Sequence, residues 1–158
     1  MNHIDTEDLV LLDAGPKGLG AFAARRFQRG ETVLVFRGQE LDPREIADFT
    51  HTIQVDLDRF LGASGGVDDY VNHSCDPSCI LRMPVSELEL VARRPIAPGE
   101  EITFDYSTCL LFEPPLDSCA CGAPACRGRV VTFWDLAPAV RRRYRRLDAV
   151  PGFILRGR

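Results

Sequence analysis

Polar and apolar residues alternate along much of the chain with a period of two, which is the pattern of strands that bury one face. The clearest cases are Thr52–Leu57 and Glu87–Arg93. Glu31–Phe36 is instead a β-branched run, and Glu101–Tyr106 follows a Pro-Gly turn signal. The sequence predicts strands at Leu9–Leu12, Ala21–Ala23, Glu31–Phe36, Thr52–Leu57, Glu87–Arg93 and Glu101–Tyr106. Short strands separated by Gly, Pro and Asp turns indicate a mainly β domain.

The helical period is strongest near the C-terminus, where one apolar stripe recurs at helical spacing: Leu136, Val140, Tyr144 and Leu147. Pro138 suits the first turn of such a helix, and we expect Pro151-Gly152 to end it. The arginines of residues 141–146 then fall largely on its solvent side. A shorter helix is predicted at Pro43–Phe49, with Asp42 as its N-cap.

The chain has 158 residues, of which 45% are hydrophobic and 27% charged. This size fits one domain, and the composition excludes collagen, coiled coils and disorder. No window approaches the roughly 18 apolar residues of a membrane-spanning helix, so we expect no membrane partner. The acidic start, MNHIDTEDLVLLD, lacks the basic and apolar regions of a signal peptide.

Charge is unevenly distributed along the chain. Residues 127–158 hold nine arginines and two aspartates, a formal charge of +7, while the remainder carries −11 of the net −4. The acidic remainder favours a basic partner and repels nucleic acid. The basic tail could do the reverse, but a solvated helix face is the usual explanation of such a run. We therefore do not expect nucleic acid as a partner.

Three of the six cysteines lie close together as C-x-C-x4-C: Cys119, Cys121 and Cys126. On a loop with Gly and Pro, three thiolates can converge on one ion, and a structural zinc site takes four ligands. The fourth ligand must come from Cys75, Cys79 or Cys109. The alternatives are a disulfide framework or free buried thiols, but cysteines separated by one residue pair poorly, and no export signal supports oxidation.

Two further segments carry candidate binding chemistry. The run Lys17-Gly18-Leu19-Gly20 lets backbone approach a ligand closely, although a hairpin turn explains it as well. The run from Tyr70 to Pro77 concentrates hydrogen-bond donors and acceptors, and a local turn before the proline is the alternative explanation of Asn72 and His73.

Two candidate catalytic arrangements follow from the same region. A Cys75–His73 pair is one option, but we expect these side chains to point to opposite faces of an extended segment. Tyr106 ends a predicted strand, where its hydroxyl could orient a nucleophile. A tyrosine that only packs is the commoner case.

In their order along the chain, these segments resemble the SET-domain protein lysine methyltransferases with a post-SET zinc loop, of the small bacterial type. The resemblance rests on five blocks: Lys17–Ala23, Gly30–Gly38, Asn72–Cys79, Gly99–Tyr106 and Cys119–Gly128. It runs from about Leu9 to Val130, and the N-H-S-C-D-P and G-E-E-I-T-F-D-Y runs are its most specific parts.

The resemblance implies a mainly β, SET-domain fold of several short, curved β-sheets with a pseudoknot, plus a C-terminal helix. In the pseudoknot, the Asn72–His73 segment is threaded through a loop near the C-terminal strand. The chain would divide into a SET domain at 1–112, a post-SET zinc loop at 113–130 and a helical tail at 131–158. We expect a cytoplasmic location in a bacterial cytosol, with export to a host left open.

By matching position, the resemblance implies S-adenosylmethionine as methyl donor and a lysine amine as acceptor. The donor-binding residues would be Lys17, Gly18, Leu19, Gly20, Asn72 and His73. Tyr106 would be catalytic, and the lysine channel would be lined by Phe36, Phe104 and Tyr106. One structural Zn²⁺ per chain would be held by Cys75, Cys119, Cys121 and Cys126. Cys79 and Cys109 would then be ordinary thiols.

The chain departs from the family pattern at several places: Asp69-Tyr70 stands where the family often has Arg-Phe before the Asn-His segment, and there is no pre-SET cysteine cluster. Phe36 stands where the family usually has tyrosine, so one channel hydroxyl is missing. Only a short segment joins Thr52–Leu57 to Asn72, so the insert that often shapes the substrate groove is nearly absent. The implied partner is a basic lysine-containing protein or peptide; its identity, the number of methyl groups and the oligomeric state stay open. The alternative function is a non-catalytic, zinc-stabilised interaction module.

Overall fold

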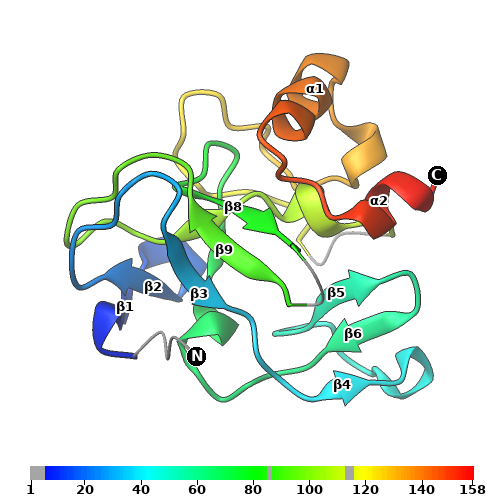
Figure 1. The fold of residues 1–158 in the computed structure, drawn as a ribbon, viewed down its shortest axis with the longest axis horizontal. Helices are drawn as coiled ribbons and strands as arrows, with labels where there is room; N and C mark the ends of the chain where they lie inside the picture. The colour runs from blue at the N-terminus through cyan, green and yellow to red at the C-terminus, as the bar shows by residue number, and fades with distance from the viewer. Residues whose placement is uncertain (1–5, 85–86, 113–115) are drawn as a thin grey trace.

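The computed structural model describes residues 6–84, 87–112 and 116–158, in which ten short strands form four small sheets (Figure 1). The strands are β1 (Leu9–Asp13), β2 (Leu19–Ala23), β3 (Thr32–Val35), β4 (Glu40–Leu41), β5 (Ile53–Asp56), β6 (Arg59–Leu61), β7 (Asn72–His73), β8 (Cys79–Arg82), β9 (Glu89–Ala92) and β10 (Thr103–Phe104). The α-helices are α1 (Pro138–Arg146) and α2 (Gly152–Arg156). Short 3₁₀ helices are η1 (Thr6–Asp8), η2 (Gly15–Lys17), η3 (Pro43–Glu45), η4 (Val67–Tyr70), η5 (Tyr106–Cys109) and η6 (Phe133–Asp135).

The sheet β3-β9-β8 separates two hydrophobic cores. Successive side chains of a strand point to opposite faces, so Leu90 packs in the main core while its neighbour Val91 packs against the C-terminal tail. In β8, Cys79 and Leu81 pack in the main core and Ile80 packs against the tail. The remaining sheets are the β1-β2 hairpin, β4-β6-β5 and the pair β10-β7.

The tail is part of the folded unit. Its buried side chains, which pack beyond β8 and β9, include Phe133, Leu136, Tyr144, Phe153 and Ile154. Figure 1 shows α1 and α2 together on this side of the molecule. Fully burying one such side chain contributes roughly 1.5–3 kcal/mol, so the tail stabilises the β domain on which it packs.

The parallel pair β7-β10 joins two segments that lie far apart in the sequence. Asn72 pairs with Thr103 and His73 with Phe104. The backbone N–H of Ser74 also donates to the Phe104 carbonyl at 3.0 Å. This pairing sets the Asn72–His73 segment against the strand that precedes Tyr106, which is the contact that the expected pseudoknot requires.

All six predicted strands are present, although the last is much shorter than expected. Of the predicted Glu101–Tyr106, only Thr103–Phe104 forms β10, because Asp105 accepts a hydrogen bond from the Ser107 N–H and caps η5 at this point. The sequence analysis missed β4, β6, β7 and β8. β4, β6 and β7 have two or three residues each, too few for a periodic pattern to show, and in β8 three apolar residues follow one another without alternation.

The C-terminal helix is confirmed as α1, with Pro138 in its first turn. The expectation that Pro151-Gly152 ends it is wrong: α1 ends at Arg146, the chain reverses at Asp148 with a φ of 52°, and Gly152 begins α2. Pro43–Phe49 forms only the 3₁₀ turn η3, capped as expected by Asp42.

Two further expectations concern the domain boundary and membrane spanning. The predicted domain boundary at 112/113 adjoins residues 113–115, which lie outside the described residues. None of the helices in the described ranges has the length and apolar character needed to cross a membrane.

Candidate active site and metal centre

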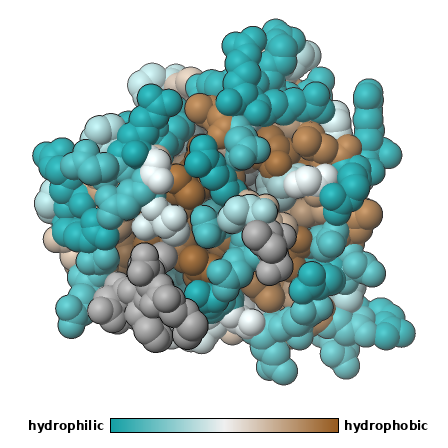
Figure 2. Space-filling view, in the orientation of Figure 1, coloured by the Kyte–Doolittle hydropathy of each residue, from teal (hydrophilic) through white to brown (hydrophobic). Residues whose placement is uncertain are grey.

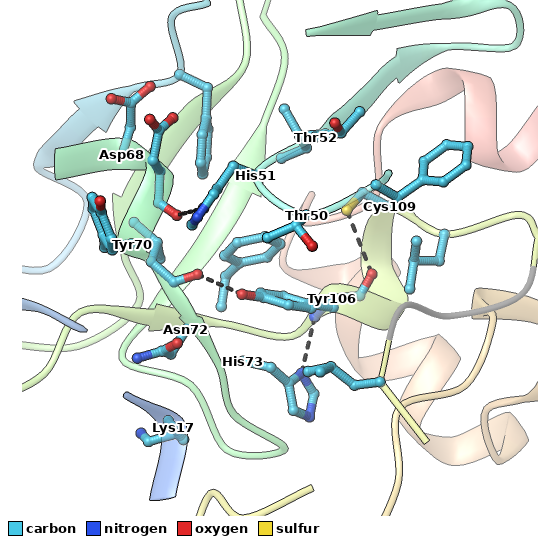
Figure 3. A pocket seen from close by; sticks show the side chains of 18 of the residues that line it. Lys17, Thr50, His51, Thr52, Asp68, Tyr70, Asn72, His73, Tyr106 and Cys109 are labelled. Carbon is cyan, nitrogen blue, oxygen red and sulfur yellow. Dashed lines mark hydrogen bonds between the residues drawn. The ribbon is translucent and has the colours of Figure 1, made fainter. Parts of the chain in front are cut away.

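A cavity of about 560 Å³ collects most of the predicted site residues (Figure 3). Its wall includes Lys17, Leu19, Phe36, Asn72, His73, Phe104, Tyr106 and Cys119. Gly18 and Gly20 belong to the same segment as Lys17 and Leu19 but are not part of the wall, and neither are the other three predicted zinc ligands. The volume is in the range of about 300–1,000 Å³ that is usual for small-molecule sites.

Tyr106 is fixed at both ends to the segment around β7. Its hydroxyl donates to the Val71 carbonyl at 2.7 Å, and its backbone N–H donates to His73 Nδ1 at 3.1 Å, as Figure 3 shows. Burial raises the pKa of the Tyr106 phenol well above its ordinary value. The side chain is therefore a neutral phenol whose proton is already engaged by a carbonyl.

Two phenylalanines complete an aromatic wall beside Tyr106. The Phe104 ring lies 4.8 Å from the Tyr106 ring and 5.8 Å from the Phe36 ring, between centroids. Both phenylalanines are buried. Phe36 enters from the end of β3 and Phe104 from β10, so the wall forms only when the two sheets pack together.

Lys17 and Asn72 converge on Glu101, a residue that the sequence analysis did not assign to the site. Lys17 Nζ forms an ion pair with the Glu101 carboxylate. The Asn72 amide donates to Glu101 Oε1 and to the Leu19 carbonyl, both at 3.0 Å. A Cβ on Gly20 would come within 2.9 Å of both Asn72 and Glu101. Any larger residue at this position would displace one of these two side chains, which come from distant segments and lie directly against the backbone.

His73 links the Tyr106 segment to the cysteine cluster. Since its Nδ1 accepts from the Tyr106 N–H, the neutral ring carries its proton on Nε2, which faces Cys75 Sγ at 3.4 Å. Burial, and to a smaller extent the charges of Arg127 and Lys17, lower the pKa of His73 to about 4, although Asp105 opposes them. The imidazole is therefore neutral and acts as a donor toward the cysteine.

The expectation that His73 and Cys75 point to opposite faces is wrong. Residues two apart on an extended segment lie on the same side, and the side chains meet at 3.4 Å. A nucleophilic pair still does not result, because burial raises the pKa of the Cys75 thiol well above its usual value in the absence of a metal ion.

Four cysteines lie together in the arrangement that a zinc ion requires. The Sγ atoms of Cys75, Cys119, Cys121 and Cys126 all lie within 4.8 Å of one another. Tetrahedral zinc with Zn–S bonds of about 2.3 Å sets its sulfur atoms about 3.8 Å apart, and Cys75 and Cys119 are separated by 3.8 Å. None of the six cysteines forms a disulfide, and Cys79 and Cys109 are buried elsewhere.

Backbone donors around the cluster favour thiolates. The Arg127 N–H donates to Cys75 Sγ at 3.4 Å, and the Gly128 N–H donates to Cys126 Sγ at 3.3 Å. Partial burial raises the pKa of Cys121, but hydrogen bonds from backbone and neighbouring thiols outweigh it and lower that pKa to about 6. The donor set, the spacing and the surrounding N–H groups thus fit Zn²⁺.

Asp105 connects the site to the zinc loop and to the tail. Its buried carboxylate accepts hydrogen bonds from both terminal nitrogens of Arg127, at 2.7 and 2.8 Å, and from the Tyr144 hydroxyl at 2.7 Å. His73 Nδ1 lies 3.6 Å from the same carboxylate. We call Asp105, Arg127 and Tyr144 the Asp105 junction.

The sequence analysis missed Glu101, Asp105 and Arg127 as functional side chains. Each stands next to a predicted residue: Asp105 between Phe104 and Tyr106, Arg127 after Cys126, and Glu101 inside the G-E-E run. The available signal was a charged residue inside an otherwise apolar or cysteine-rich block. The partners of these three residues, however, come from other segments, so the local sequence does not indicate which residues pair.

Comparison with known proteins identifies the family. The model of the SET domain matches residues 18–107, more than half of the chain. Similar curated proteins include the histone-lysine N-methyltransferase trr of Drosophila melanogaster, 31% identical over 128 residues that cover 70% of this chain and 5% of that protein. A histone-lysine N-methyltransferase of Schizosaccharomyces pombe, described as H3 lysine-4 specific, is 33% identical over 130 residues, covering 70% of this chain and 14% of that protein.

Solved structures show the same fold. The chain resembles KRYPTONITE, in a crystal structure with mCHH DNA, an H3(1–15) peptide and SAH, with a TM-score of 0.66 at 21% identity, over 78% of this chain and 29% of that one. It also resembles the methyltransferase domain of human SETMAR, with a TM-score of 0.65 at 21% identity, over 78% of this chain and 58% of that one. This chain belongs to the SET domain family. It spans only 5% and 14% of the lengths of the two curated relatives.

Proposed function

We propose that this chain transfers a methyl group from S-adenosylmethionine to the ε-amine of a lysine in a protein substrate. The observation that carries the proposal is that Tyr106, Asn72 and His73 share one cavity wall with the Lys17–Leu19 segment. The names of the curated relatives support the same reaction class. A non-catalytic module is disfavoured, because it has no need to keep these side chains together in an open cavity.

The proposed donor site lies where Lys17–Gly20 meets Asn72 and His73. When bound, S-adenosylmethionine supplies a methyl group on a sulfonium sulfur, which a neutral amine displaces in line. The close packing of Gly20 against Asn72 and Glu101 holds the backbone of this segment in place. Such rigidity lowers the entropy cost of binding, because little has to be ordered when the donor arrives.

The proposed acceptor site is the aromatic wall of Phe36, Phe104 and Tyr106. Apolar rings remove water from an incoming ammonium, which lowers its pKa and favours the neutral amine that reacts. The Tyr106 proton is held by the Val71 carbonyl, so the hydroxyl oxygen is left to accept an N–H from the amine. This contact would aim the nitrogen lone pair at the methyl group, and positioning of this kind is a large source of rate.

Zinc has a structural role in this proposal. The four cysteines would hold one Zn²⁺, which ties the loop around residues 119–128 to Cys75 and through His73 to the backbone of Tyr106. A loop with so little apolar surface gains its order from the metal. No chemical step is assigned to the ion.

The proposed substrate is a basic protein segment. The chain outside residues 127–158 carries a formal charge of −11, and such a field raises the rate of encounter with a positively charged partner. By family resemblance, a phenylalanine at Phe104, where a tyrosine would narrow the channel, leaves room for more than one methyl group, while the hydroxyl missing at Phe36 removes one group that could orient the amine.

Tyr106→Phe tests the proposal. Removing one positioned catalytic hydroxyl should lower turnover by roughly 10²–10⁴-fold, while calorimetry shows unchanged donor affinity. Transfer of labelled methyl groups to core histones and to a cell lysate, followed by mass spectrometry, measures turnover and identifies the lysine. Unchanged turnover would remove Tyr106 from the mechanism. Failure of the folded, zinc-loaded wild type to bind S-adenosylmethionine would overturn the enzyme proposal itself.

A further inference from the structure

The tail carries an unusual concentration of guanidinium groups around a single indole. The Cζ atoms of Arg141, Arg145 and Arg158 lie 5.8, 5.5 and 5.1 Å from the centroid of the Trp134 ring. With Arg142 and Pro138, these residues enclose a small cavity of about 220 Å³. We call Arg141, Arg142, Arg145, Arg158 and Trp134 the Arg–Trp patch.

The charges of the patch are not neutralised by the protein. The ion pairs formed by arginines after residue 126 involve Arg127, Arg143 and Arg156. In the described part of the chain, no carboxylate pairs with any of the four patch arginines. Arg141 donates to the Trp134 carbonyl, which fixes its position without cancelling its charge. Figure 2 shows the continuous hydrophilic surface over α1 at the top of the molecule.

A simple solvated helix face does not explain this arrangement. Arg141 and Arg145 are i, i+4 neighbours on α1, where like charges repel each other, and their guanidinium groups share the Trp134 ring with a third one, that of Arg158. One of them, Arg158, comes from the end of the chain and not from α1. The tertiary fold therefore brings like charges together: cation–π contact with the indole holds them there, and an anion bound between them would relieve their repulsion.

We propose that the Arg–Trp patch binds the phosphodiester backbone of a nucleic acid. Planar guanidinium groups match phosphate oxygens in a bidentate manner. The cavity is smaller than the roughly 300–1,000 Å³ of sites for whole small molecules, so it suits one group of a polymer. Exposed Arg146 extends the positive surface along α1 beyond the cavity, as a polymer with a phosphate at every step requires.

This assignment gives the uneven charge of the chain one explanation. A basic protein bound to a nucleic acid offers positive charge to the −11 body and negative charge to the +7 tail at the same time. The substrate class is then a basic protein that is held on nucleic acid, and this extension rests on the proposed function. Binding by the patch itself does not depend on it, and it reverses our expectation from sequence that nucleic acid is not a partner.

Fluorescence anisotropy with a labelled 20-base-pair DNA duplex and a labelled single-stranded RNA tests the proposal without any methyl donor. Both probes should bind, because backbone contacts carry no base specificity. The triple variant R142Q/R145Q/R158Q should bind at least about tenfold more weakly and lose about three units of the salt slope, roughly one for each phosphate contact removed.

A matched control removes the same charge elsewhere. Arg44, Arg59 and Arg94 are exposed and each is paired with a carboxylate, so R44Q/R59Q/R94Q changes the net charge equally and should keep nearly all binding. The only tryptophan of the chain is Trp134, so its intrinsic fluorescence gives a second, label-free signal that should change on titration with the duplex.

Three results would overturn the proposal. One is equal weakening in both triple variants, which would make the effect one of net charge alone. Another is equal binding of polyglutamate, which would assign the patch to an acidic protein. The third is self-association at low salt without duplex binding, which would assign it to the acidic face of a second copy. Methylation of a free basic peptide by R142Q/R145Q/R158Q tests the proposed enzyme separately, and it should stay at the wild-type rate.

Discussion

The Asp105 junction and the Arg–Trp patch use arginines of the same basic stretch in opposite ways. At the junction, Arg127 has 20% of its side-chain surface exposed and forms a bidentate pair with a fully buried carboxylate. At the patch, four arginines line the cavity beside Trp134, and in the described residues none of them pairs with a carboxylate. The first arrangement is internally neutral and closed, and the second leaves its charge available.

The difference shows that partner geometry, and not residue type, decides what an arginine contributes. Breaking a bidentate pair away from water is costly because the charge left behind is poorly solvated and unpaired. Exposed arginines in high dielectric contribute little to folding. The junction should therefore affect stability and the patch should affect binding.

The largest expected effect comes from loss of the proposed zinc ion, which would hold the loop of Arg127. Cys119→Ser removes one of four ligands, so metal analysis should find close to no zinc where the wild type has one per chain, and donor binding should fall with it. Cys79→Ser, at a buried thiol outside the cluster, should keep its zinc. Full zinc retention in Cys119→Ser would show a different ligand set.

Asp105→Asn breaks the junction without changing its shape. It leaves Arg127 partly buried beside a neutral amide, and the free energy of unfolding should fall by about 3–5 kcal/mol. Urea unfolding measures this against Asp148→Asn, the same change at an exposed aspartate, which should stay within about 0.5 kcal/mol. Equal losses in the two variants would show that the burial and pairing of Asp105 add nothing to stability beyond an exposed aspartate.

Tyr144→Phe makes the smallest change to the same junction. The Asp105 carboxylate loses one of its hydrogen bonds but keeps Arg127, so the free energy of unfolding should fall by about 1 kcal/mol. Thermal melts and urea unfolding measure it. In the Asp105→Asn background the loss should shrink, because the charged acceptor is gone; an undiminished loss there would place the effect in core packing.

Much of the site was predictable because its residues lie in short, specific runs. The runs around Asn72, Tyr106 and Cys119–Cys126 contain the residues that the structure brings to one cavity and one metal cluster. Strand positions with a clear period of two were predictable for the same local reason. Strands such as β8 were not, since its three consecutive apolar residues, Cys79, Ile80 and Leu81, do not alternate with polar ones and serve two cores.

The sequence by itself determined the class of fold, the strands of β1, β2, β3, β5 and β9, and three of the four cysteines that fit zinc, Cys119, Cys121 and Cys126. Each of these depends on residues close together in the chain. The tertiary structure alone decided that Asp105 takes Arg127 and Tyr144 as partners, and that Arg158 joins the arginines of α1 around Trp134. Whether a charge is neutralised depends on its distance from an opposite charge. Packing of the two cores sets that distance, and the order of residues along the chain does not.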